Sequence, residues 1–232
     1  MTDPVQLPQL DLTNRPSVAD LVFAELQRQV LSLELQPGAK ISEVDVAKQM
    51  GVSRQPVRDA FYRLSKMGFL LIRPQRATTV TLISSEAVMQ ARFIRTALEV
   101  ETVRVAAEAL GNADIEALER IIDAQDKAIK AEDKPGFHRL DDQFHREICM
   151  RSGLGFTWEL IAENKGHMDR VRMLSLIFAS RAAWEDHLRI LDALKSRNPE
   201  ASAEAMRAHL SRIKTQIERI RSENFAWFAK EE

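Results

Sequence analysis

The stretch that decides the fold is residues 42–64, SEVDVAKQMGVSRQPVRDAFYRL. Ser42 is placed to cap a short helix that runs through Gln49, because a serine side chain can accept a hydrogen bond from the first backbone amides of a helix. Gly51 then supplies the turn, since glycine readily adopts the left-handed backbone that ends many helices. Ser53 is placed to cap a further helix. The stretch therefore predicts two helices joined by a tight turn.

The second of these helices has two different faces. At about 100° per residue, one arc is apolar and holds Val57, Ala60, Phe61 and Leu64. The complementary arc is polar and holds Arg54, Gln55, Arg58, Tyr62 and Arg63. We expect the first face to pack against the protein and the second to reach outward.

The residues before this stretch predict one more helix. Ser17 can cap it, residues 36–38 (Gln-Pro-Gly) end it, and its apolar stripe is Val22, Leu26, Val30 and Leu33. Residues 1–16 show no periodicity and contain three prolines, so we expect a flexible arm there.

A hairpin is predicted after the two helices. The apolar and β-branched runs 69–72 and 78–83 flank a basic turn at 73–77. Three helices followed by such a hairpin make a winged helix-turn-helix over residues 17–83. Residues 48–76 hold seven basic residues and one acidic residue, although the whole chain has a net charge of -1. A local excess of positive charge is typical of a nucleic-acid-binding surface.

The exposed arc supplies candidates for DNA contacts. Arg54 and Arg58 stand one helical turn apart and are the candidates for base contacts, because an arginine can donate to two acceptors on a guanine edge. Gln55 and Tyr62 are candidates for base or phosphate contacts. In the wing, Arg73 and Arg76 are candidates for contacts with the DNA backbone or minor groove. The alternative at this point is an ordinary amphipathic packing unit with a solvated charged face.

From residue 84 onward the pattern is helical throughout. Helices are predicted at 85–110, 114–131, 135–152, 156–178, 181–197 and 200–225, and glycine, asparagine and proline residues separate most of them. Short connections favour antiparallel neighbours. We therefore predict a mainly α protein, with an N-terminal winged helix-turn-helix and, over residues 84–232, an antiparallel all-helical bundle for effector binding and dimerisation.

Composition excludes several classes of protein. The chain has a single cysteine, Cys149, so an internal disulfide framework is excluded. No apolar run approaches the roughly 18 residues that a membrane span requires. The N-terminus is acidic and contains proline, unlike a signal peptide. We expect a cytoplasmic protein with no membrane partner.

All five histidines fall in the predicted helical bundle, which raises the question of a metal site. Asp141 and His145 stand four residues apart on one helix face, a spacing that suits two-point chelation. His187 and His209 lie 22 residues apart, so two antiparallel helices could set them side by side. These four ligands suit Zn, Ni, Mn or Fe. The alternative is that the histidines are surface or capped residues, and His138 and His167 are expected to be structural.

The N-terminal residues resemble the GntR family of winged-helix repressors. The matching runs are LQPGAKISE at 35–43, VAKQMGVSRQPVRDA at 46–60 and LSKMG at 64–68. The resemblance implies that Arg54 and Arg58 match the family's DNA-contacting arginines. It also implies a homodimer that binds a two-fold operator in double-stranded DNA. This chain departs from the family at the tip of the wing, where glycine is usual and Gln75-Arg76-Ala77-Thr78 stands instead.

The helical part resembles the FCD ligand-binding domain of the FadR-like branch of this family. The matching runs are RTALE at 95–99, DDQFHR at 141–146, HLRILDA at 187–193 and AMRAH at 205–209. The resemblance implies a metal held by Asp141, His145, His187 and His209, and a small organic acid whose charge Arg95 neutralises. For Arg95 the alternative is an ion pair with Glu99, four residues away.

Together these features predict a repressor whose operator affinity a small carboxylic acid controls from a divalent metal site. Whether the acid releases or promotes DNA binding stays open. One alternative is a metal-independent regulator whose helical domain is a scaffold or senses an acyl chain. A more remote alternative is a metalloenzyme, although the sequence offers no clear general base beside the candidate ligands.

Overall fold

The computed structural model describes residues 16–230, apart from the side chains of residues 176–178. The arm predicted at residues 1–16 therefore lies, except for Pro16, outside the described residues. Contacts divide the described chain into two compact units, one made of residues 16–28 and 40–79 and the other of residues 29–39 and 80–230. The predicted mainly α class is confirmed. Within the described residues, no helix has the length and apolar character needed to cross a membrane.

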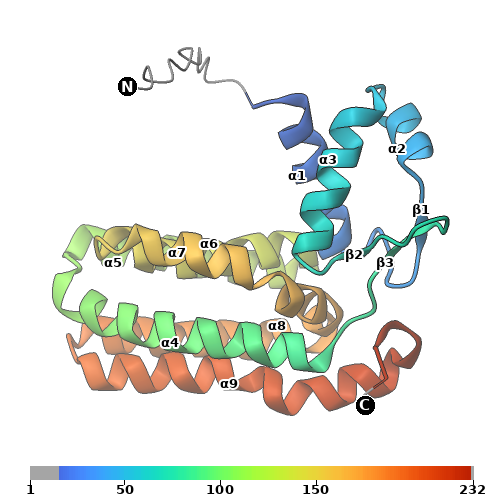
Figure 1. The fold of residues 1–232 in the computed structure, drawn as a ribbon. Coiled ribbons are helices and arrows are strands. Elements are labelled where there is room, and N and C mark those ends of the chain that lie inside the picture. The colour runs from blue at the N-terminus through green and yellow to red at the C-terminus, as the bar shows by residue number, and fades with distance from the viewer. Residues whose placement is uncertain (1–15, 231–232) are drawn as a thin grey trace, which may run out of the picture. The chain divides into compact units, whose positions relative to one another are not determined.

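The N-terminal elements form three helices and a small sheet (Figure 1). The elements in chain order are α1 (Val18–Leu31), β1 (Lys40–Ile41), α2 (Glu43–Met50), α3 (Arg54–Lys66), β2 (Leu70–Leu71) and β3 (Thr78–Val80). The strand order is β1-β3-β2, and Lys40 of β1 pairs antiparallel with Thr79 of β3. The predicted hairpin is present as β2 and β3. Strand β1 was not predicted, because two residues are too few to show an alternating pattern.

Local capping explains where these helices begin and end. The Ser42 hydroxyl accepts hydrogen bonds from the backbone amides of Val44 and Asp45, and Gly51 ends α2 with φ 67°. Ser53 occupies the N-cap position of α3, but its side chain makes no capping hydrogen bond. The prediction that Ser53 caps α3 is therefore right about position and wrong about the bond.

Helix α3 shows the two predicted faces. Its apolar arc is fully buried, with 0% exposure for Val57, Ala60, Phe61 and Leu64. Its polar arc is exposed except for Arg63, which is half-buried. Nη1 of Arg63 lies 2.9 Å from Oδ1 of Asp20, and its guanidinium stacks over the ring of Phe23 at 3.8 Å. Arg63 therefore ties α3 to α1 and does not belong to the outward face.

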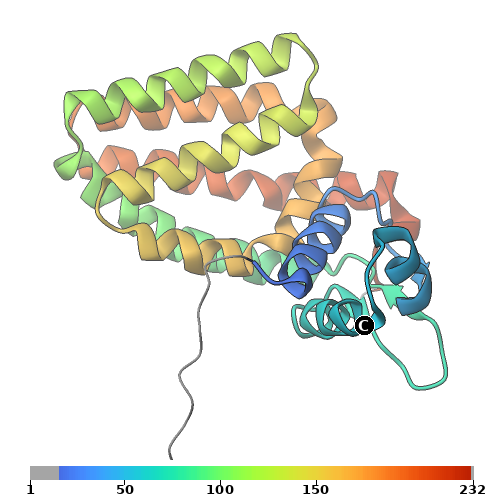
Figure 2. The same cartoon turned by 90° about the horizontal axis from the view of Figure 1, so that it is seen from above.

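The C-terminal unit is a bundle of antiparallel helices (Figures 1 and 2). Its elements are α4 (Ser85–Ala109), α5 (Asn112–Lys130), α6 (Lys134–Arg151), α7 (Gly155–Asn164), α8 (Gly166–Lys195), α9 (Pro199–Glu223) and η1 (Phe225–Trp227). Helix α8 packs against α4, α5, α6 and α9. It is therefore the central element of the bundle.

One predicted helix boundary is wrong. The break predicted between residues 178 and 181 is absent, and α8 runs through this region without interruption. Residues 179–183, Ala-Ser-Arg-Ala-Ala, include no glycine or proline, so nothing there opposes a helix. The actual break is at Lys165, directly before Gly166, a residue type that is unfavourable inside helices.

The segment that enters the bundle is fixed by the C-terminus. The backbone N–H of Ile83 donates to Trp227 O at 2.8 Å, and the N–H of Ala229 donates to Ile83 O at 2.8 Å. Ile83 and Phe228 are both buried in one apolar cluster with residues of α4, α8 and α9. Residues at the two ends of the bundle sequence thus form one local structure.

The tip of the wing generates a prediction about stability. Gln75 adopts φ 57°, a left-handed conformation that costs a residue with a Cβ about 1–2 kcal/mol. Gln75→Gly removes this cost but loses about 0.5–1 kcal/mol to the greater freedom of the unfolded chain. We expect the free energy of unfolding to rise by about 0.5 kcal/mol in urea titrations. Arg76→Gly, at an exposed neighbour without a positive φ, is the control and should give no gain.

Candidate functional site

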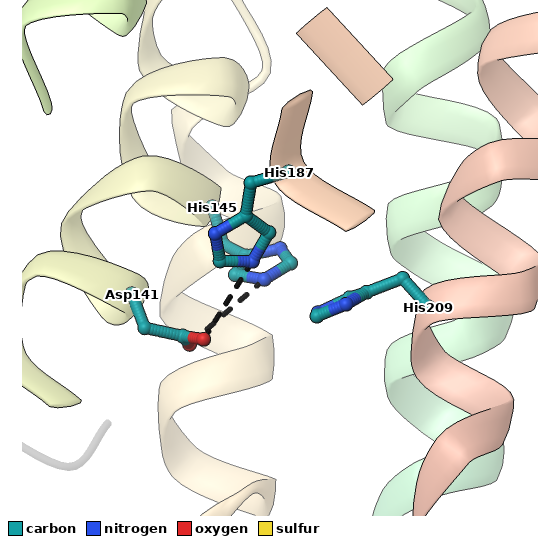
Figure 3. Close-up of side chains that lie close together, drawn as sticks. All are labelled: Asp141, His145, His187 and His209. Carbon is teal, nitrogen blue, oxygen red and sulfur yellow. Dashed lines mark ion pairs between the residues drawn. The ribbon is translucent and has the colours of Figure 1, made fainter. Parts of the chain in front are cut away.

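Four predicted ligands meet inside the bundle (Figure 3). Asp141 and His145 project from α6, one turn apart, while His187 comes from α8 and His209 from α9. One ligand atom of each residue lies within 4.8 Å of the others. Asp141, His145 and His187 are buried and His209 nearly so. The structure thus brings together all four residues, which we call the ligand cluster.

Each imidazole of the ligand cluster has an outer partner at Nδ1. Nδ1 of His145 lies 2.5 Å from Oε2 of Glu99, and that of His209 lies 3.4 Å from Oδ2 of Asp186. Nδ1 of His187 lies 2.8 Å from Oε1 of Gln125. Because these partners are oxygen acceptors, they favour the tautomer with hydrogen on Nδ1 and a lone pair on Nε2. This is the arrangement that outer partners give to metal-binding histidines.

Two inner nitrogen atoms of the ligand cluster lack protein partners. Nε2 of His145 and of His187 are buried and have no hydrogen-bond partner among the described residues. Oδ1 of Asp141 lies 3.6 Å from Nε2 of His187, and Oδ2 lies 3.9 Å from Nε2 of His145. The three ring centroids are 4.7–5.3 Å apart. Orphaned lone pairs around one point fit a cation, which would satisfy them together.

The ionisation of the cluster suits the same chemistry. Burial lowers the pKa of His209, and burial with the nearby His209 holds the pKa of His187 well below its ordinary value. Burial opposes the charge of Asp141, but the positive charge of Arg172 outweighs it and holds the pKa of Asp141 well below its usual range. Neutral imidazoles with an ionised carboxylate are the state that binds a divalent metal.

A cavity of about 60 Å³ adjoins the ligand cluster. Asp141 and His209 line it, together with three arginines, Arg95, Arg172 and Arg212. Nε of Arg95 lies 2.5 Å from Oε1 of Glu99, so the ion pair considered above is present. Nη2 of Arg95 is nevertheless buried without a hydrogen-bond partner. The pair with Glu99 therefore leaves Arg95 one donor for an anion in the cavity.

Several contacts around the cluster were not predicted from the sequence. Glu99, Gln125 and Asp186 act as outer partners, and Arg172 donates through Nη2 to Oδ2 of Asp141. They lie on three helices, α4, α5 and α8, and of the four only Asp186, which precedes His187, is next to a ligand in the sequence. His138 lies in a second charged group with Asp142 and Asp169, and His167 is half-buried at the start of α8.

The candidate DNA surface lies on α3 and the wing. Arg54, Gln55, Arg58 and Tyr62 are exposed, as are Arg73 and Arg76. Oε2 of Glu43 lies 3.4 Å from Nε of Arg58 and 3.6 Å from Nη2 of Arg54, so one carboxylate from α2 faces both arginines. Arg73 and Arg76 share a surface hollow with Lys40 of β1, a residue that the sequence analysis did not single out.

Comparison with known proteins agrees with both units. Residues 19–80 match the bacterial regulatory proteins of the gntR family, and residues 90–212 match the FCD domain. The chain is 34% identical over 225 residues to the uncharacterized HTH-type transcriptional regulator YdfH of Escherichia coli O6:H1, covering 96% of this chain and 99% of the relative. It is 35% identical over 212 residues to the HTH-type transcriptional repressor RspR of Escherichia coli K12, covering 90% and 93%.

A solved structure shares the fold. The structure of McbR/YncC from E. coli superposes with a TM-score of 0.75 at 23% identity, covering 90% of this chain and 99% of that one. The relatives are regulators of transcription and the matched families are not enzyme families, which sets aside the metalloenzyme alternative. The chain belongs to the gntR family of bacterial transcriptional regulators and carries an FCD domain.

Proposed function

We propose that this regulator is a repressor whose affinity for operator DNA is controlled by a small organic acid bound at a divalent metal ion. The observation that carries the proposal is the convergence of Asp141, His145, His187 and His209 on one buried point. Nε2 of His145 and of His187 are buried without a hydrogen-bond partner among the described residues, while each of the three Nδ1 atoms lies 2.5–3.4 Å from a side-chain oxygen. An accidental group of surface histidines would show neither feature.

The donor set indicates the class of metal. One carboxylate and three imidazoles suit Zn, Ni, Mn or Fe, and four protein ligands leave coordination positions open in an ion that accepts more than four. A bound ion would supply positive charge and an open position for a carboxylate oxygen. Nη2 of Arg95 would then hold the remaining charge of the acid, since it is buried and lacks a partner.

The adjoining cavity favours a small polar effector over an acyl chain. About 60 Å³ accommodates only a few non-hydrogen atoms, and the lining combines three arginines with apolar residues such as Phe137 and Leu210. An acyl-chain site would need a much larger cavity. This observation argues against the acyl-chain alternative.

Helix α8 offers a route from the site to the segment that leads into the wing. It carries His187 of the ligand cluster and also Arg170, whose Nη2 donates to Thr81 O at 2.6 Å. Control of DNA binding requires that the acid bind the two arrangements of the regulator with different affinity. A shift of α8 on acid binding would change the support of residues 80–83.

A homodimer remains our expectation for a two-fold operator, and light scattering would measure its mass.

Metal binding is tested by elemental analysis of purified protein. We expect about one divalent ion per chain. His187→Gln removes one ligand and should lower the bound metal by at least about tenfold after dialysis. His167→Gln is the control, because His167 is a half-buried histidine at the start of α8 that belongs to neither group of possible metal ligands. Equal metal content in wild type and His187→Gln would contradict the assignment.

Effector binding is tested by thermal denaturation with a panel of small carboxylic acids. A stabilising acid should raise the Tm of metal-loaded protein and not of protein treated with a chelator, because the ion provides part of its site. The same acid should change the affinity for DNA in fluorescence anisotropy. An acid that stabilises both forms equally would show that its site does not include the ion.

DNA contacts are tested on an operator selected from random duplexes by binding. Arg58→Ala should weaken binding to this operator by about 10- to 100-fold, as expected for a lost arginine–guanine contact, and weaken binding to random DNA less. Arg28→Ala, on α1, removes the same charge and is the control, with a loss below about threefold. Equal losses on operator and random DNA would assign Arg58 to phosphate contact alone.

A further inference from the structure

Arg172 of α8 connects the ligand cluster to a second acidic pair. Its Nη2 donates to Oδ2 of Asp141, whose side chain is 2% exposed. Its Nη1 lies 3.3 Å from Oδ1 of Asp142 and 3.3 Å from Oδ1 of Asp169. One guanidinium thus contacts three carboxylates. Asp141 belongs to the ligand cluster, while Asp142 and Asp169 lie with His138 in a second group whose side chains could hold a metal ion.

The acidic pair, Asp142 and Asp169, has a second cation on its other side. Nζ of Lys165 lies 2.7 Å from Oδ2 of Asp142 and 2.5 Å from Oδ2 of Asp169. Lys165 and Arg172 therefore face three carboxylates with two positive charges. The acidic pair is incompletely neutralised while Arg172 is shared with Asp141, and it can accept more of the charge of Arg172.

A divalent ion in the ligand cluster changes this balance. Asp141 would then be neutralised by the ion, and the guanidinium bonded to Asp141 would stand beside a like charge in a buried site, where repulsion is strong. Arg172 can move away from Asp141 and still keep Asp142 and Asp169 as ionic partners.

We propose that Arg172 is a built-in counter-cation that competes with the metal ion for Asp141. When the metal ion is bound, Arg172 pairs with Asp142 and Asp169 instead. The inference rests on the metal site proposed above. Arg172 is a positioning residue and not a ligand. It keeps Asp141 ionised and ordered before loading and weakens metal binding. It also lies two residues from Arg170 on α8, so its movement would bear on the contact with Thr81.

A rival role for Arg172 predicts the opposite sign. If Arg172 only orients the carboxylate for the metal, its removal weakens metal binding, as loss of an outer partner generally does. If Arg172 competes with the metal, its removal strengthens binding.

The test measures affinity for Zn²⁺ and Mn²⁺ of metal-stripped, full-length protein by competition with a fluorescent chelator. Arg172→Gln should bind about tenfold more tightly than wild type. Arg172→Lys keeps the charge and should bind close to wild type. Arg181→Gln, at an exposed arginine of α8 that pairs with Asp126 and Glu185, removes the same charge and should leave the affinity unchanged.

A double-mutant cycle distinguishes movement of Arg172 to the acidic pair from a simple effect of its charge on metal affinity. Asp169→Asn should weaken metal binding in the wild-type background, because Arg172 then has a weaker ionic partner when it leaves Asp141. In the Arg172→Gln background the same substitution should have no effect. Circular dichroism of each variant checks that the helices are retained.

The outcomes are distinguishable. Unchanged or weaker binding by folded Arg172→Gln, or equal effects of Asp169→Asn in both backgrounds, would overturn the competition while leaving the metal site in place. Failure of the wild-type protein to bind either ion would overturn the proposed metal site itself.

Discussion

A buried carboxylate surrounded by imidazoles is the constraint on which the C-terminal unit depends. Asp141 carries a negative charge at 2% side-chain exposure, and such a charge is unstable in a protein interior unless a cation balances it. The chain supplies Arg172 for this purpose. The bundle must therefore hold α6, which carries Asp141, against α8, which carries Arg172. The same two helices bring His145 and His187 together.

The rest of the bundle supports this pair of helices. Apolar residues of α4, α5, α6, α8 and α9 form one continuous core beside the ligand cluster. Phe144 of that core, adjacent to His145 in sequence, stacks on the His187 ring with centroids 4.5 Å apart. Gln125 is fixed by donating to Leu140 O at 3.0 Å, so its Oε1 faces His187. Packing and hydrogen bonds thus fix the imidazole orientations before any ligand enters.

Features set by local spacing could be predicted from the sequence, and features set by contacts between distant elements could not. The buried arc of α3 follows from a period of 3.6 residues, and the pairing of Asp141 with His145 follows from one turn of α6. The 22-residue spacing of His187 and His209 allowed them to meet on antiparallel helices, and the resemblance to the FCD domain implied that they complete the ligand set. Glu99, Gln125, Asp186 and Arg172 become partners only through tertiary packing. Strand β1, the left-handed Gln75 and the missing Ser53 bond likewise depend on the three-dimensional context of short segments.

The two units use arginine under opposite physical conditions, and this difference matches the roles proposed for them. Arg54 and Arg58 are more than half exposed, and their shared contact with Glu43 in water is worth little, so DNA can replace it at small cost. Arg95 and Arg172 are buried, and breaking their ion pairs without a substitute partner is costly. Only a ligand that brings its own charge into the cavity can rearrange them. Exposed arginines suit reversible contact with many phosphates, whereas buried arginines suit selection of one charged ligand.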